Sequence, residues 1–423
     1  MDPRSVRTGF AGRAGWDLAP NELSSRLAER RAAGLPVLDL TESNPTRCAL
    51  PAAGLALRTA LAELAMDPRS LRYEPDARGD VDARAAIAAY HTAKGPVLAP
   101  EHVLLTSGTS EGYAHLFRLL ADPGERVLVP SPSYPLFGLL ADLESVEVAP
   151  YPLRLRGGRW RIDLDALAAA ARPRTRAVLV VHPNNPTGSL ADAEEVAALR
   201  TFCRERGLAL VADEVFADHR SKAAPPAAPQ TLLPGAADAE DGPLTFVLSG
   251  ASKVLALPQL KVAWMAVAGP RRLRDEALAR LEVIADTYLS VSTLSQLLLP
   301  RLLAARAEIA SEIATRVTEN RTRVAARIAR HGEIELLAAD GGWGAILRVR
   351  GDGRKGAPDE DDLVTQLVLR HGVSLQPGWF FDLDPEDEAG RPAAHLVLSL
   401  LPDPRCVEQG LAHVVEAIAA TSR

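Results

Sequence analysis

The chain has 423 residues, of which 47% are hydrophobic, and it carries a formal net charge of −6 at pH 7. This length favours two domains with separate cores, and the dispersed negative charge argues against a nucleic-acid or membrane partner. No apolar run reaches the ~20 residues needed to cross a bilayer, and the N-terminus lacks an apolar signal segment. Three scattered cysteines and the lack of metal-ligand spacing favour a cytoplasmic enzyme that binds no metal.

Between about residues 80 and 270, short runs of valine, leucine and alanine alternate with helical patterns. Such continuous apolar runs are typical of parallel strands that are buried on both faces. We therefore predict a doubly wound α/β layer, whose ligands bind at the carboxyl ends of the strands. The expected strands are residues 102–105, 126–129, 177–181, 208–212, 245–248 and 262–267.

The remainder of the chain has a different pattern. Residues 271–281 and 294–331 are amphipathic and helical, and a smaller mixed segment with strands near 333–337, 344–349 and 395–400 follows them. We expect this segment to form a second domain packed on the first. Residues 219–243 and 351–362 have the composition of solvated loops.

Two polar motifs follow predicted strands. Residues 106–110 (Thr-Ser-Gly-Thr-Ser) open a helix, where free amides and hydroxyls suit a phosphate, although an ordinary helix cap has the same composition. Residues 182–188 (His-Pro-Asn-Asn-Pro-Thr-Gly) fix an irregular turn that aims an amide side chain. A plain turn needs no such specific string.

Asp213 and Lys253 follow two further strands. A carboxylate at the end of a buried strand is unfavourable unless it is paired, and the alternative interpretation of Asp213 is a capping residue. Lys253 is notable because the chain has only five lysines, and a desolvated lysine, unlike arginine, can act as a nucleophile. The alternative for Lys253 is a surface lysine on a Gly/Ser turn.

Together these motifs provide an anion cradle, an amide, a carboxylate and a reactive amine at one edge of one sheet. Pyridoxal phosphate requires this combination. Its phosphate needs the cradle, its aldehyde needs the amine, its ring nitrogen needs the carboxylate and its phenolic oxygen needs the amide.

At these residues the chain resembles the class I/II aminotransferases, the aspartate aminotransferase-like group of fold type I pyridoxal-phosphate enzymes. The resemblance implies a large domain with a mainly parallel seven-stranded sheet flanked by helices, and a smaller α+β domain. It divides the chain into an N-terminal arm that also forms part of the small domain (1–48), a large cofactor-binding domain (49–298) and a small C-terminal domain (299–423). The matching segments are residues 73–79, 107–109, 132–135, 185–188, 213–214, 252–253, 341–342 and 377–378.

The resemblance also implies residue roles. Lys253 would hold the cofactor as a Schiff base and then move a proton, Asp213 would pair with the ring nitrogen, and Asn185 would bond the ring hydroxyl. Tyr134 would stack on the ring, and Tyr73 would reach the phosphate of the partner subunit, which implies a homodimer with shared active sites. The other implied cofactor-binding residues are Ser107, Gly108, Thr109 and Ser252, with Gly108 and Thr109 at the phosphate.

The chain departs from the family at three positions. Phe216 stands where the family usually has tyrosine, so one donor to the ring oxygen is missing. Lys261 stands where the family usually has a bidentate phosphate-binding arginine. Val397 stands where the family has the arginine that clamps the substrate α-carboxylate, and His395 lies on the same strand face. With Asn44, these last two residues are the expected substrate contacts.

The resemblance implies an aminotransferase that moves an amino group from an amino acid or related amine to a 2-oxo acid. The alternative is another reaction of the same cofactor, such as decarboxylation, β-elimination or condensation, on an unusual substrate. Val397 keeps this alternative open because function depends on the site and not on the fold. A regulator without turnover is disfavoured, since residues 1–45 are too short and too weakly basic for a DNA-binding domain.

Overall fold

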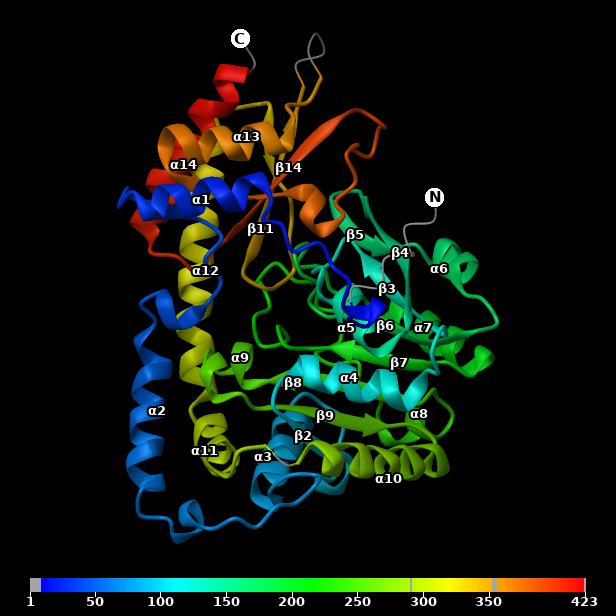
Figure 1. The fold of residues 1–423 in the computed structure, drawn as a ribbon. Helices are drawn as coiled ribbons and strands as arrows, with labels where there is room; N and C mark the ends of the chain where they lie inside the picture. Colours follow the sequence, from blue (N-terminus) through cyan, green and yellow to red (C-terminus); the bar gives the residue numbers. More distant parts are fainter. Residues whose placement is uncertain (1–8, 290, 352–355, 422–423) are drawn as a thin grey trace.

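The computed structural model describes residues 9–289, 291–351 and 356–421. A large sheet and a small sheet lie one above the other, with helices around both (Figure 1). Within the described residues the large sheet has eight strands, in the order β2 (Val103–Thr106), β9 (Ala263–Ala268), β8 (Thr245–Gly250), β7 (Ala209–Asp213), β6 (Thr175–Val181), β3 (Arg126–Ser131), β4 (Glu147–Arg156) and β5 (Arg159–Ile162).

The centre of the large sheet is parallel, as predicted. β8, β7, β6, β3 and β4 run in one direction, whereas β9 is antiparallel to both β8 and β2. One strand more than the expected seven is present, because β5 folds back on β4 as an antiparallel hairpin. The apolar runs do not reveal β4, since Pro150 and Pro152 interrupt it and its second half alternates leucine with arginine.

The small sheet is antiparallel and joins segments that are distant in the sequence. Its strand order is β10 (Ile334–Leu336), β11 (Gly344–Arg350), β14 (Ala393–Ser399) and β13 (Gln376–Pro377). A separate parallel pair consists of β1 (Leu38–Asp39) and β12 (Val373–Ser374), which ties the N-terminal segment to this part of the molecule.

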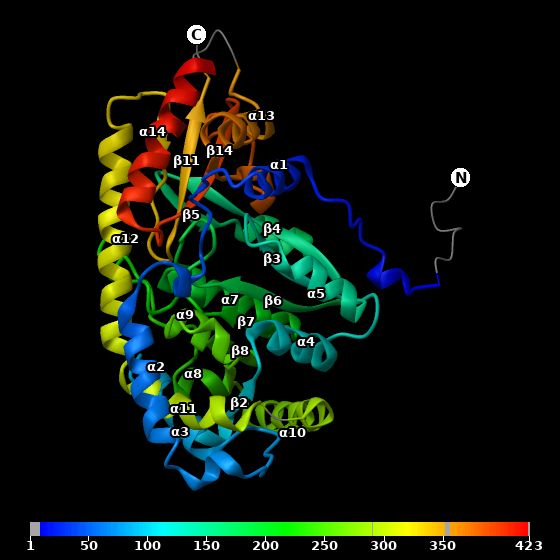
Figure 2. The same cartoon turned by 60° about the vertical axis from the view of Figure 1, so that its left-hand side comes forward.

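Helices cover both sheets (Figure 2). Among the described residues, no helix is both long and apolar enough to span a membrane. The helices are α1 (Glu22–Ala32), α2 (Pro51–Leu64), α3 (Val81–Thr92), α4 (Thr109–Leu120), α5 (Leu136–Glu144), α6 (Leu164–Ala170), α7 (Ala193–Arg206), α8 (Ala236–Glu240), α9 (Ala251–Val254), α10 (Arg271–Tyr288), α11 (Thr293–Ala304), α12 (Arg306–Ile328), α13 (Glu360–Gln366) and α14 (Pro404–Thr421).

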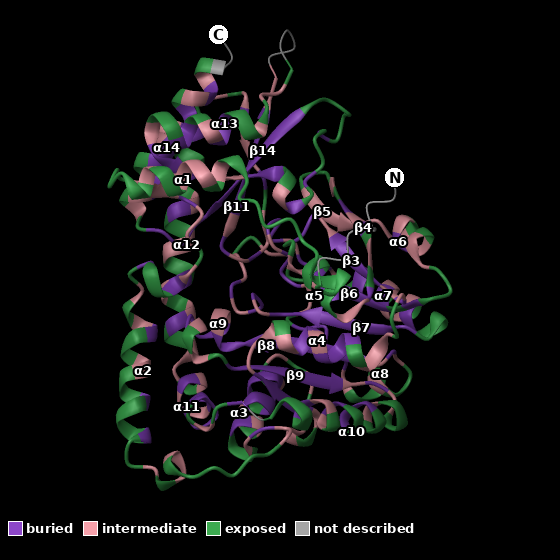
Figure 3. Ribbon diagram, in the orientation of Figure 1, coloured by how far each residue is buried: buried purple, intermediate pink, exposed green. Residues whose placement is uncertain are grey.

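The large sheet is buried on both faces, and alternate residues of one strand enter different cores (Figure 3). In β8, Phe246 and Leu248 belong to the cluster that contains residues of α4, α5 and α10. Val247, between them, belongs to the cluster that contains residues of α3, α7 and α11. This two-sided burial explains why the strands consist of continuous apolar residues.

Helix α12 connects the two cores and runs along one side of the molecule in both ribbon views (Figures 1 and 2). Ile309 and Ile313, near its start, belong to the core of the large sheet. Val324 and Ile328, near its end, belong to the core of the small sheet. The predicted amphipathic stretch 294–331 therefore forms α11 and α12, and it holds the small sheet against the large one.

The prediction that residues 219–243 form a solvated loop is wrong in part. Thr231 and Leu232 are buried, and both donate hydrogen bonds to the buried carboxylate of Glu214. The Leu232 amide and the Thr231 hydroxyl donate to Glu214 Oε1 over 2.5 and 3.0 Å. The segment thus satisfies one oxygen of the Glu214 carboxylate, which would otherwise be left unpaired. In the second expected loop, residues 352–355 lie outside the described residues.

Candidate active site

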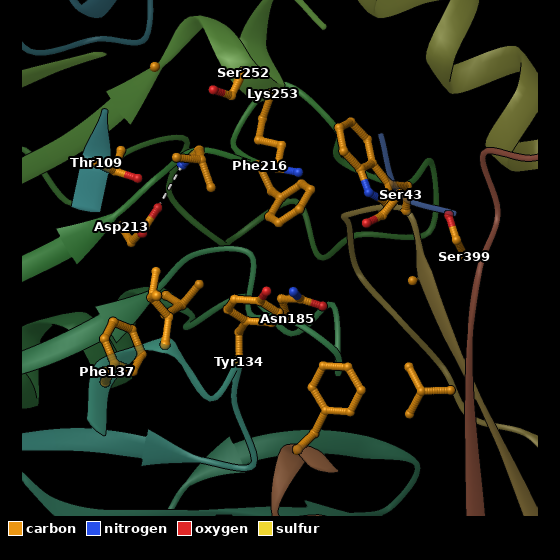
Figure 4. A pocket seen from close by; sticks show the side chains of 18 of the residues that line it. Ser43, Thr109, Tyr134, Phe137, Asn185, Asp213, Phe216, Ser252, Lys253 and Ser399 are labelled. Carbon is orange, nitrogen blue, oxygen red and sulfur yellow. Dashed lines mark hydrogen bonds between the residues drawn. The ribbon is translucent and has the colours of Figure 1, made fainter. Parts of the chain in front are cut away.

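A cavity of about 300 Å³ lies at the carboxyl ends of β6, β7 and β8 and reaches the small sheet (Figure 4). The strand-end motifs converge on it, as expected for neighbouring parallel strands. The predicted site residues that line it are Thr109, Tyr134, Asn185, Asp213, Phe216, Ser252, Lys253 and Val397.

Lys253 lies in the short helix α9, directly after β8. Burial lowers the pKa of its amine to about 8, an effect that the charge of Asp213 partly opposes. Its Nζ atom lies 4.9 Å from the centre of the Trp343 ring and 5.6 Å from that of Phe216, so two aromatic faces contact the amine. The His219 ring, through Nε2, bonds the Lys253 carbonyl oxygen over 2.9 Å and holds the backbone in place.

Asp213 ends β7 with its carboxylate at the cavity. The Tyr113 hydroxyl donates to Oδ2 over 2.9 Å, and the Val215 amide donates to Oδ1 over 3.1 Å. Burial raises the pKa of Asp213, while these two donors and the charge of Lys253 lower it. The structure thus presents a buried carboxylate with one fixed orientation.

The turn after β6 carries Asn185 and packs against the small-sheet part of the chain. Gly188 has φ of +67°, and an added side-chain carbon would collide with the carbonyl of Gly341. The Asp340 amide also donates to the Gly188 carbonyl oxygen over 3.0 Å. Glycine is therefore required at position 188, and the close approach positions the segment that leads to Trp343.

The opposite end of the cavity is suited to an anion. Gly108 caps the 12-residue helix α4, and Thr109 is its first residue. A side-chain carbon at Gly108 would lie 3.5 Å from Lys261 Nζ, so the glycine and the ammonium group border the same space. The Ser107 amide is engaged by Glu111 Oε2 over 2.6 Å. A helix N-terminus beside a lysine is a typical phosphate site.

Comparison with known protein families identifies the family of this chain. The family model for aminotransferase class I and II matches residues 36–393. The chain belongs to this family. Structural similarity agrees, since an aminotransferase from Mycobacterium tuberculosis has a TM-score of 0.77 at 25% identity, with 97% of this chain and 99% of that chain covered. The alanine aminotransferase from Pyrococcus furiosus has the same fold, with a TM-score of 0.84 at 21% identity and coverage of 97% and 100%.

Similarity to characterised aminotransferases is more local in sequence. The glutamate-pyruvate aminotransferase AlaA of Escherichia coli K12 is 29% identical over 229 residues, which are 52% of this chain and 53% of that protein. The alanine aminotransferase of Mycobacterium tuberculosis H37Rv is 29% identical over 271 residues, 62% of this chain and 59% of that protein. The chain thus spans little more than half the length of these relatives.

Class I and II aminotransferases use pyridoxal phosphate. The residues present fit this cofactor on three counts. Lys253 supplies a buried amine whose lowered pKa favours the nucleophilic neutral form. Asp213 supplies a carboxylate held by two donors, and Lys261 lies beside the N-terminus of α4.

Three of the predicted cofactor residues lie beside the anion end without lining the cavity, namely Ser107, Gly108 and Lys261. The remaining predicted residues of this aminotransferase-family chain also lie outside the cavity. Tyr73 is 71% exposed in the loop before α3. Asn44 accepts hydrogen bonds from the amide and hydroxyl of Thr46, while its neighbour Ser43 lines the cavity. His395 is buried within β14, where its amide donates to Glu360 Oε1 over 2.6 Å.

Several residues of the site are not evident from the sequence. Tyr113 lies one helical turn into α4, and His219 lies in the segment interpreted as a loop. Gln376 and Ser43 come from the small-sheet part and from the N-terminal segment. Trp343 lies in the glycine-rich turn just before β11, between Gly341-Gly342 and Gly344.

Proposed function

We propose that this protein is a pyridoxal-phosphate-dependent aminotransferase that moves an amino group from an amino compound to a keto acceptor. The observation that carries the proposal is the pair formed by Lys253 and Asp213 in one cavity. Burial lowers the pKa of the Lys253 amine to about 8, close to working pH, against the opposing charge of Asp213. When bound, the cofactor supplies an electron-withdrawing ring that stabilises negative charge on the carbon next to the amino group.

Different residues of the chain have separate roles around that ring. Lys253 Nζ attacks a carbonyl carbon as the neutral amine, and once released it carries a proton at the same atom, a role that typically contributes ~10²- to 10⁴-fold in rate. Tyr113 and the Val215 amide hold Asp213 in one orientation, in which its carboxylate would bind a protonated ring nitrogen. Trp343 and Phe216 cover the amine and exclude water from it.

The functional unit in this proposal is a homodimer in the cytoplasm. Tyr73 lies outside the cavity of its own chain and is 71% exposed, and its neighbour Leu71 is 91% exposed. A tyrosine and a leucine this exposed in one loop are expected where a partner subunit covers them. The three cysteines are free thiols, which supports a reducing compartment.

Visible spectroscopy of the purified protein with added pyridoxal phosphate tests the proposal. We expect a borohydride-sensitive band that Lys253→Ala abolishes and that Lys222→Ala, an exposed control, leaves unchanged. We then expect at least one amino donor to convert the bound cofactor to its pyridoxamine form. A protein that binds the cofactor but yields that form with no donor is not an aminotransferase, and it catalyses another reaction of the same cofactor.

A further inference from the structure

The cavity has two chemically different ends, with the Lys253 amine between them (Figure 4). Thr109, Ser252 and Asp213 form one end, which suits the phosphate and ring nitrogen of the cofactor. Ser43 and Ser399 lie toward the other end, with residues of the small sheet. A substrate that reacts at Lys253 therefore extends toward the small sheet.

The small-sheet end lacks positive charge. Among the described residues that line the cavity, Lys253 is the only cation and Asp213 is the only carboxylate. The rest of this end consists of hydrocarbon, aromatic, hydroxyl and amide groups. Within the lining that this chain supplies, a free carboxylate placed here meets no cation other than the amine that reacts. An anion desolvated without a paired charge is strongly disfavoured.

Val397 forms the centre of this wall. It faces Ile346 across β11, and together with Leu337, Phe381 and Leu383 the two form a separate apolar cluster. On its other side, Val397 pairs with Gln376 of β13. The Gln376 side chain lies on the same sheet face and lines the cavity. The wall thus offers a branched hydrocarbon beside a neutral amide.

Ser399 adds a neutral hydroxyl to the same wall. It lies two residues beyond Val397 on the same strand face. Its Oγ atom accepts from the Leu401 amide over 3.2 Å, which leaves its own O–H free to donate. Together with the Gln376 amide, this hydroxyl suits a neutral polar group and does not neutralise a full charge.

The arginines beside this wall already have partners. Glu335 and Asp387 bind Arg350, and Arg321 donates to the carbonyl oxygens of Leu337 and Gly344, each over 3.4 Å. Arg348 lies opposite His395, two residues along β11 from Ile346, and is buried. Its guanidinium is bound by Glu335 over 2.7 Å and by Glu388 over 2.5 Å. Two carboxylates already compensate this cation, so it cannot take the place of a carboxylate clamp.

We propose that the substrates of this site carry a neutral group where an α-amino acid carries its carboxylate. This inference rests on the proposed function and narrows its substrate class to primary amines whose reacting carbon bears a carboxamide, a hydroxymethyl or a hydrocarbon substituent. The donor gives up its amino group and one hydrogen and becomes a ketone or aldehyde. The acceptor, a neutral ketone or aldehyde in the same cavity, gains both and gives up its carbonyl oxygen, so no outside oxidant is needed.

Binding of two unreactive probes to the holoenzyme tests the inference. The probes are 3-phenylpropanamide and 3-phenylpropanoate, which differ only in the neutral or charged end, and binding is followed by calorimetry at pH 8. We expect the amide to bind at least tenfold more tightly to the wild type. Val397→Arg should reverse this order, whereas Val397→Met, similar in length but uncharged, should retain it. Equal or tighter binding of the carboxylate to the wild type overturns the inference, even where Val397→Arg does not fold.

A second arm separates this inference from the proposed function. The cofactor band is followed with L-phenylalanine, L-phenylalaninamide and 2-phenylethylamine as donors. Faster conversion with the two neutral donors supports the inference, and faster conversion with L-phenylalanine overturns it while leaving the aminotransferase function intact. A protein that does not take up the cofactor overturns the proposed function and the inference with it, whereas a holoenzyme that prefers the carboxylate probe overturns the inference alone.

Discussion

Replacing Lys253 by methionine tests the electrostatic state of the cofactor-free protein. Burial lowers the pKa of the amine from 10.5 to about 8, and that difference corresponds to about 3 kcal/mol of destabilisation when the folded protein holds the charged form. Contacts with Phe216 and Trp343 offset ~1 kcal/mol of this. Methionine retains the unbranched shape without the charge. We therefore expect Lys253→Met to raise the free energy of unfolding by about 2 kcal/mol at pH 7.

The pH dependence makes this prediction specific. Between pH 8 and 10.5 the unfolded chain holds a proton on Lys253 that the folded protein lacks, so the stability of the wild type rises with pH across this window. The advantage of the methionine variant is full below pH 8 and disappears by about pH 10.5. Urea unfolding of the cofactor-free proteins, followed by circular dichroism at a fixed protein concentration, measures it at pH 7 and pH 10. A variant that is less stable at pH 7, or an equal difference at both pH values, refutes the reasoning.

Three further predictions concern the groups around this amine. Tyr113→Phe removes a donor to Asp213 and should weaken cofactor binding roughly tenfold in a fluorescence titration, whereas Tyr151→Phe, which removes another buried hydroxyl, should affect stability only. Burial raises the pKa of Glu214 from 4.5 to about 7, so Glu214→Gln should be more stable than the wild type by roughly 1–3 kcal/mol at pH 8 and equal to it near pH 4.5 in urea unfolding. Lys261→Ala should weaken cofactor binding by roughly tenfold or more.

The controls for these variants distinguish lost contacts from general damage. Lys222→Ala removes an exposed lysine and should leave the cofactor affinity unchanged. An equal loss of affinity in Tyr151→Phe and Tyr113→Phe would show that the hydroxyl bond to Asp213 does not hold the cofactor. A Glu214→Gln variant that is destabilised at pH 8 would show that the carboxylate is stabilised by Thr231 and Leu232 more than burial penalises it.

The half of the site on the large sheet could be predicted from the sequence because its determinants are local. Asp213 and Lys253 each directly follow a buried strand, and parallel strands bring their carboxyl ends to one edge. The order of motifs along the chain therefore already determines which side chains meet. Burial on both faces makes those strands continuous apolar runs, which is the clearest strand pattern a sequence contains.

The small-sheet half could not be predicted, because its contacts depend on pairing between distant segments. Gln376 lies beside Val397 only through the register of β13 with β14, and a two-residue strand carries no detectable periodicity. Ser43 reaches the cavity because β1 pairs with β12. The buried part of the expected loop at 219–243 had no local signal either, since Thr231 is buried to serve a carboxylate that precedes it by 17 residues.

At Lys253, the folding stability of the cofactor-free protein and the reactivity of the amine have opposite requirements. Burial in the surrounding core destabilises the charged amine, and contacts with Phe216 and Trp343 offset only part of this effect. The same burial keeps a neutral fraction of the amine at working pH. A variant without the amine gains stability and loses the nucleophile. Capture of the cofactor removes the free amine from the folded protein, so binding relieves part of the penalty that the cofactor-free state carries. The stability gained in Lys253→Met therefore measures how much folding stability the reactive amine costs the cofactor-free protein. Such a cost is expected where an active site is selected for reactivity at the expense of stability.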